Sequence, residues 1–160
     1  MNWNSQQVDQ LGEGNLHTYG RKKEFNGEFI VSITHAMGLN LARLIPFIIM
    51  TNIVRKQVTK NKDILYAEVQ GQLEAGVGQT ITVWRKGKDM VSFRDSGWHK
   101  IALMFFGWTL NGKNVHSYFI TYKTSEIPLG EEAEEIAKTY GTYMHKGEKI
   151  RKSNRPPVSI

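Results

Sequence analysis

Hydrophobic and polar residues alternate over four stretches of the chain, which predicts four β-strands. The first stretch shows the pattern most clearly, because Phe29, Val31 and Ile33 alternate with neighbours that include Ser32 and Thr34. The four predicted strands cover residues 28–35, 64–73, 79–85 and 115–122. Gly76 and Gly78 separate the second strand from the third, so these two strands are expected to form a hairpin.

Between the strands, apolar residues recur at the spacing of one helix face. The longest such segment is expected to begin at Pro46, because proline suits the first helical position, and to end near Thr59. Further helices are predicted over residues 88–94, from 96 to about 110, and over 130–140. In the last of these, glutamates fill the first turns, where negative charge stabilises a helix.

The predicted order is β-α-β-β-α-β followed by one more helix. This order is typical of an α+β, ferredoxin-like antiparallel sheet with an extra C-terminal helix. The expected organisation is an N-terminal arm over residues 1–27, a ferredoxin-like domain over 28–145 and a basic flexible tail over 146–160.

Apolar and aromatic residues occur on both sides of the predicted strands. With helices on one face of the sheet, the other face would offer Tyr66, Trp84, Tyr118 and Ile120 or their alternates. A face of this kind needs a cover, and a second identical sheet would supply it. A homodimer in the form of a dimeric α/β barrel is therefore expected, with the N-terminal arm folding over the face as the alternative.

The composition excludes several classes of site. The chain has no cysteine, which rules out disulfides, thiolate metal sites and thiol nucleophiles and favours a reducing, cytoplasmic location. No histidine-rich or acidic motif has ligand spacing, so no metal site is expected. The apolar run 39–54 is too short and too often interrupted for a membrane span. The net charge of +6 is read as solvated surface and not as a nucleic-acid interface.

Two segments carry a family resemblance. Residues 82–99, from Thr82-Val83-Trp84 through Phe93 to Ser96-Gly97-Trp98-His99, resemble a block of the spheroidene-monooxygenase-like and antibiotic-biosynthesis-monooxygenase-like proteins. These belong to the dimeric α/β-barrel superfamily. The segment Ser125-Glu126-Ile127-Pro128, followed by Glu132-Ala133 and Ile136, is similar to the strand exit and last helix of relatives in that superfamily.

The resemblance implies that His99 is the functional histidine. It would serve as a general base or as a haem ligand, while the alternative is a histidine that packs against the sheet edge. Aromatic residues around it would line a pocket for an apolar or aromatic substrate, although the same spacing also suits plain core. These pocket residues are Trp84, Phe93, Trp98, Phe105, Phe106 and Trp108.

The sequence therefore favours a monooxygenase-like enzyme that acts on an apolar or aromatic substrate. Its cofactor is open, since both haem and cofactor-independent use of oxygen are compatible with the resemblance. The alternative is a non-catalytic, dimeric ligand-binding protein of unknown role, with haem among the ligands that the same cavity would hold. The expected partners are a second copy of the chain and a small apolar ligand, with no nucleic acid.

Overall fold

A computed structural model describes residues 15–16, 27–72, 74–128, 130–146 and 148–152, without the side chains of Asn15, Leu16, Trp108 and Thr109. Most of the predicted N-terminal arm and the end of the predicted tail lie outside these residues. The described strands form one antiparallel sheet in the order β1-β3-β4-β2-β5-β6-β7. Their bounds are Asn15–Leu16 for β1, Phe29–Met37 for β2, Ile64–Gln72 for β3, Val77–Trp84 for β4, His116–Thr124 for β5, Thr142–His145 for β6 and Glu148–Arg151 for β7.

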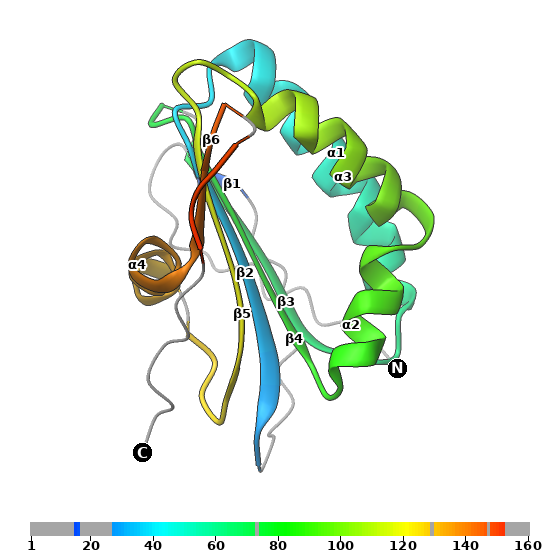
Figure 1. Cartoon of the computed structure of the whole chain (residues 1–160). Helices are drawn as coiled ribbons and strands as arrows, with labels where there is room; N and C mark the ends of the chain where they lie inside the picture. Colours follow the sequence, from blue (N-terminus) through cyan, green and yellow to red (C-terminus); the bar gives the residue numbers. More distant parts are fainter. Residues whose placement is uncertain (1–14, 17–26, 73, 129, 147, 153–160) are drawn as a thin grey trace.

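Helices cover both faces of this sheet (Figure 1). On one face lie α1 (Leu41–Lys60), α2 (Gly87–Arg94) and α3 (Gly97–Leu110), and on the other lies α4 (Gly130–Tyr140). The central order β3-β4-β2-β5, with α1 after β2 and α3 before β5, is that of a ferredoxin-like sheet. The predicted α+β, ferredoxin-like fold with an extra C-terminal helix is confirmed. None of the helices in the described part of the chain is long and apolar enough to cross a membrane.

The first helix begins five residues before the predicted position. Asn40 caps it, because its side-chain oxygen accepts a hydrogen bond from the backbone N–H of Arg43 at 3.2 Å. Pro46 consequently lies inside the helix, where it cannot donate the backbone bond that other residues make. The prediction of a start at Pro46 was wrong because the cap, and not the proline, determines where this helix begins.

The main hydrophobic core lies under α4. Side chains of β2, β4 and β5 point to this face, and Val31, Ile33 and Ile81 are fully buried there. Ala133 and Ala137 of α4 are also fully buried, since small side chains let the helix approach the strands closely. Within the described part of the chain, α4 therefore covers this sheet face over β2 and β5.

The strands point most of their serine and threonine side chains toward α1, α2 and α3. Trp84 belongs to this side, because it is buried against Phe93 of α2 with ring centroids 5.1 Å apart. The prediction that Trp84 lies on the opposite face was wrong. Tyr66 and Tyr118, which were predicted to share that face with it, do lie there. A β-bulge between Ile64 and Tyr66 shifts the start of β3, which explains why strict alternation fails in that strand.

Two short strands extend the sheet beyond the predicted fold. β6 pairs with β5, and β7 pairs with β6 over residues that the sequence analysis placed in a flexible tail. Arg151 of β7 donates hydrogen bonds to the backbone carbonyls of Lys138 and Gly141, which ties the strand to the end of α4. Each strand has only four residues, too few for an alternating pattern to predict them.

Candidate functional site

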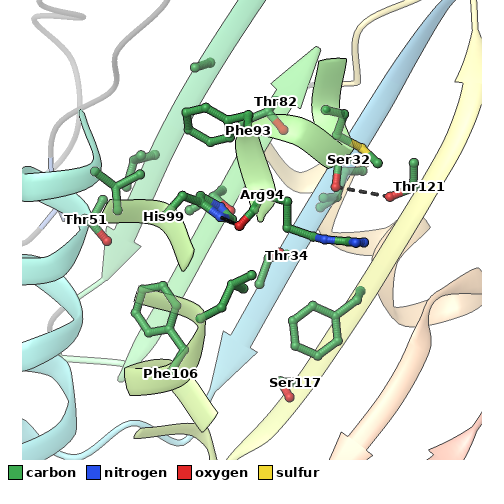
Figure 2. Close-up of a pocket in the computed structure, with 18 of the residues that line it drawn as sticks. Ser32, Thr34, Thr51, Thr82, Phe93, Arg94, His99, Phe106, Ser117 and Thr121 are labelled. Atoms are coloured by element: carbon green, nitrogen blue, oxygen red, sulfur yellow. Dashed lines mark hydrogen bonds between the residues drawn. The ribbon is translucent and has the colours of Figure 1, made fainter. Parts of the chain in front are cut away.

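A cavity of about 730 Å³ lies between the sheet and the layer formed by α1, α2 and α3. Its floor is the polar face of β2, β3, β4 and β5, and its roof consists of side chains from the three helices. A volume of this size is typical of sites for small organic ligands, which span roughly 300–1,000 Å³. Figure 2 shows lining residues of both kinds around the space between strands and helices.

Hydroxyl groups dominate the floor of the cavity. The side chains repeat at every second position of a strand and thus share one face: Ser32 and Thr34 on β2, Thr80 and Thr82 on β4, and Ser117 and Thr121 on β5. Across neighbouring strands, the Thr121 hydroxyl donates to Ser32 Oγ at 3.2 Å. The floor therefore offers several hydrogen-bonding groups to the oxygen atoms of a ligand.

Aromatic rings form much of the roof. Phe47 of α1 and Phe106 of α3 lie with their ring centroids 5.2 Å apart, and both line the cavity. Phe93 of α2 packs between Trp84 and His99, with centroid distances of 5.1 and 4.8 Å. Flat apolar groups pack well against such rings, so the roof suits an aromatic or polyene ligand.

His99 lines the cavity from the first turn of α3. Its Nδ1 atom lies 3.1 Å from the carbonyl oxygen of Arg94, and a carbonyl can only accept a hydrogen bond. In the neutral ring the proton is therefore on Nδ1, and Nε2 is the basic nitrogen. Burial is the main cause that lowers the pKa of His99 below its ordinary 6.5, with the nearby Arg94 charge acting in the same direction. The ring is accordingly neutral at pH 7.

The backbone of α3 holds this histidine in place through α1. Gln57 accepts a hydrogen bond from the backbone N–H of His99 at 2.9 Å and donates one to the carbonyl of Ser96 at 3.2 Å. A single side chain of α1 thus binds both ends of the first turn of α3. This double contact fixes the position of the His99 ring relative to the roof.

Two arginines and one hydroxyl complete the polar lining. Arg94 and Arg55 both line the cavity, and Arg94 forms a bidentate pair with Asp95 at 2.8 and 2.9 Å. Thr51 of α1 contributes a buried hydroxyl that has no hydrogen-bond partner among the described residues. An unpartnered buried hydroxyl next to a cavity is suited to bind a ligand atom or a water molecule.

The structure brings together some of the sequence-predicted site residues and separates others. Trp84, Phe93, His99 and Phe106 all line the cavity. Trp98 does not, because it lies on the outer side of α3 with 52% of its surface exposed. Phe105 is half-buried and is not part of the lining, and the side chain of Trp108 lies outside the described residues.

Sequence reasoning missed the hydroxyl floor and the two arginines. The signal for the floor was present, since serine and threonine occupy alternate positions in three strands. Threonine also has high β-propensity, which hid the role of these side chains as a polar surface. The arginines gave no signal, because a cation near the C-terminal end of a helix, such as Arg94 in the last turn of α2, also matches the helix dipole.

A second polar cluster lies on the opposite sheet face, under α4. His35 is fully buried, its Nδ1 is 3.1 Å from Gln79 Oε1, and its Nε2 is 3.8 Å from Glu134 Oε1. Burial is the main cause that lowers the pKa of His35, against the raising effect of Glu134. Glu68 is also buried there; its carboxylate accepts hydrogen bonds from Tyr66 and Gln70, and burial raises its pKa. Within the described residues no three His, Asp or Glu side chains could hold a metal ion.

Comparison with known proteins gives only distant structural likenesses. No protein-family model and no curated protein matches the sequence. A conserved protein from Methanosarcina mazei Go1 is similar with 10% identity and a TM-score of 0.49, over 59% of this chain and 91% of that one. A "Putative monooxygenase" from Fusobacterium nucleatum has 7% identity and a TM-score of 0.49, over 66% and 48% of the two chains. A "putative antibiotic biosynthesis monooxygenase" from Caulobacter crescentus CB15 has 13% identity and a TM-score of 0.47, over 62% and 92%.

Proposed function

We propose that the protein is a monooxygenase-like enzyme and that its substrate is an aromatic or polyene molecule bearing oxygen groups. The observation that carries this proposal is the cavity, which combines an aromatic roof, a hydroxyl floor and a neutral histidine. The resemblance of residues 82–99 to monooxygenase-like proteins supports the same reading, since His99 and two aromatic residues of the cavity lining, Trp84 and Phe93, come from this segment.

In this proposal the roof and floor orient the substrate, and His99 moves the proton. Nε2 of His99 accepts a proton from the substrate, while Nδ1–H stays bonded to the carbonyl of Arg94. The electron-rich substrate anion then supplies the electrons that reduce O₂. One oxygen atom enters the substrate, which loses two hydrogens in all, and the other oxygen atom leaves as water.

The alternative is an enzyme that uses haem as its cofactor, and the histidine and two arginines of the site fit this group. His99, whose Nδ1–H is bound to a backbone carbonyl, would hold the haem iron through Nε2. Arg55 and Arg94 would then pair with the haem carboxylates. When bound, haem would supply oxygen activation. The hydroxyl floor favours the cofactor-independent branch, because a polar surface is better matched to a substrate that carries oxygen groups.

Replacing His99 with alanine is expected to lower the rate of oxygen uptake by about 10²- to 10⁴-fold with a substrate drawn from a panel of quinols and polyenes. The neutral ring is the active form, so activity should be complete at pH 7 and fall as the pH drops through the lowered pKa of His99. The acid limb of kcat/KM is therefore expected below pH 6.5, the ordinary value. An oxygen electrode measures both quantities.

His145→Ala is the matched control, because the His145 ring also bonds a backbone carbonyl, that of Val115 at 3.0 Å, but lies outside the cavity. Unchanged uptake in His99→Ala would contradict the proposed role. Tight ligand binding without turnover would instead support a non-catalytic ligand-binding protein. Adding haemin separates the cofactor branches, since a Soret shift that is lost in His99→Ala identifies this residue as the ligand.

The homodimer and the cytoplasmic location remain proposals that rest on the sequence. The resemblance to the dimeric α/β-barrel superfamily supports the dimer, and the cysteine-free sequence supports the location. Sedimentation velocity at micromolar concentration is expected to give about twice the 18.3 kDa mass of the chain. A species of single-chain mass at that concentration would contradict the dimer.

A further inference from the structure

The outer side of the helix layer is unusually apolar. The described chain has nine exposed large hydrophobic side chains, and seven of them lie on α1 and α3. Six of these form what we call the helix outer face: Leu41, Ile45, Ile49, Trp98, Ile101 and Met104. Their exposed fractions run from 49% for Ile101 to 76% for Met104. Scattered exposed apolar residues are ordinary, but a concentration on two neighbouring helices indicates a binding surface.

Helical spacing places these residues on one surface. Positions 41, 45 and 49 recur every four residues, and 98, 101 and 104 every three, so each set follows one side of its helix. Residues 99, 103 and 106 of α3 line the cavity from the opposite side of the helix. The two helices lie side by side, as the Phe47–Phe106 contact at one end and the Gln57–Ser96 bond at the other require.

The charges on these two helices have one sign only. α1 and α3 contain five cationic residues and no aspartate or glutamate: Arg43, Arg55, Lys56, Lys60 and Lys100. Four of them, Arg55, Lys56, Lys60 and Lys100, are exposed at the end of the layer where the last turns of α1 meet the first turn of α3. On the other side of the sheet, α4 carries four glutamates (Figure 1). The two helices α1 and α3 are therefore apolar and cationic, whereas its four glutamates make α4 acidic.

We propose that the helix outer face binds the surface of a lipid bilayer that contains anionic lipids. Apolar side chains that project from a layer bordered by lysines match an interface where acyl chains lie beneath negatively charged headgroups. Trp98, half exposed on this face, is of the residue type that prefers the headgroup level. The helices lie on the bilayer in this arrangement and do not cross it.

A second copy of the chain fits this face less well. A two-fold contact brings the same surface patch of each copy together, and neither helix has a carboxylate to pair with the five cations. An anionic bilayer supplies both the apolar phase and the opposite charge. It would also supply an apolar substrate, if the proposed function holds, because Leu103 lines the cavity and is 39% exposed on α3.

Co-sedimentation with vesicles tests the proposal without substrate or oxygen, so its outcome is independent of the proposed function. The full chain should bind vesicles of phosphatidylcholine with one-third phosphatidylglycerol, and bind pure phosphatidylcholine at least tenfold more weakly. Ile49→Asp should weaken binding roughly tenfold or more, because an aspartate cannot enter the apolar layer. Lys56→Glu should weaken it about tenfold through charge reversal.

Two matched controls keep the test specific. Ile150→Asp changes an isoleucine that is about as exposed as Ile49, 58% against 53%. Lys149→Glu reverses the charge of an exposed lysine. Both residues lie on β7, the edge strand of the sheet, and not on α1 or α3. Both controls should bind vesicles like the unchanged protein. The proposal is overturned if the unchanged protein does not sediment with anionic vesicles, or if the β7 variants lose as much affinity as the α1 variants. It is equally overturned if Ile49→Asp leaves lipid binding intact and instead lowers the oligomeric mass, which would identify the face as a contact between copies.

Discussion

Replacing Trp84 with alanine is expected to lower the free energy of unfolding by about 3–5 kcal/mol. Trp84 is only 1% exposed, its indole N–H donates to Thr82 Oγ1 at 3.0 Å, and its ring packs on Phe93 at 5.1 Å. Alanine would remove this packing and leave a void that joins the existing cavity, which Trp84 lines. Urea unfolding followed by circular dichroism measures the change.

Trp98→Ala is the matched control, since it makes the same chemical change at a site that is 52% exposed. Its effect on the free energy of unfolding should stay below about 1 kcal/mol. If the two variants lost similar stability, the assignment of Trp84 to the interior side of the helix layer would be incorrect. The comparison therefore also tests on which face of the sheet Trp84 lies, which the sequence prediction placed wrongly.

Gly38→Ala is expected to cost about 4 kcal/mol or more, or to prevent folding altogether. Gly38 has a φ of +78°, a region that disfavours residues with a Cβ atom. A Cβ built there would lie 2.0 Å from the backbone oxygen of Asn114, so the segment that leads into β5 would have to move. Thermal unfolding and the yield of folded protein measure the effect.

Gly107→Ala provides the contrast. A Cβ at Gly107 meets no atom of the described residues within 4 Å beyond its neighbours and the backbone of its own helix, and the residue lies in the regular part of α3. Alanine should therefore leave stability unchanged or raise it by about 0.5–1 kcal/mol through better helix propensity. A loss of less than 1 kcal/mol in Gly38→Ala would show that the segment before β5 adapts easily, contrary to its close backbone contact.

The sequence predicted the strands well because alternation is a local signal. The pairing of Ile33 with Ile81 and Ile120 in adjacent strands reflects the same pattern in each of them. The start of α1 was missed because two local signals competed, a proline inside the segment and an asparagine cap before it. In the structure the asparagine cap, which satisfies a free backbone N–H, marks the boundary.

The candidate site was predictable only in part. His99 and its aromatic neighbours share one continuous segment, so a local pattern was enough to identify them. The floor hydroxyls come from three separate strands, and only the register of the sheet brings Ser32, Thr82 and Thr121 side by side. The helix outer face escaped prediction because the first half of α1 carries apolar residues on its exposed side as well as on its buried side, which gives no clear amphipathic pattern there.

The position of the hydrophobic core has a consequence for how this protein can change. Val31, Ile33 and Ile81 anchor the fold on one side of the strands, while Ser32 and Thr82 face the cavity on the other side of the same strands. Stability and ligand contact are thus assigned to alternate residues of the same backbone. Substitutions at the floor can alter which molecules the cavity accepts while the packed side stays intact. Evolution or protein engineering can therefore change the ligand specificity of this chain by single substitutions at floor positions, without loss of the core that stabilises the fold.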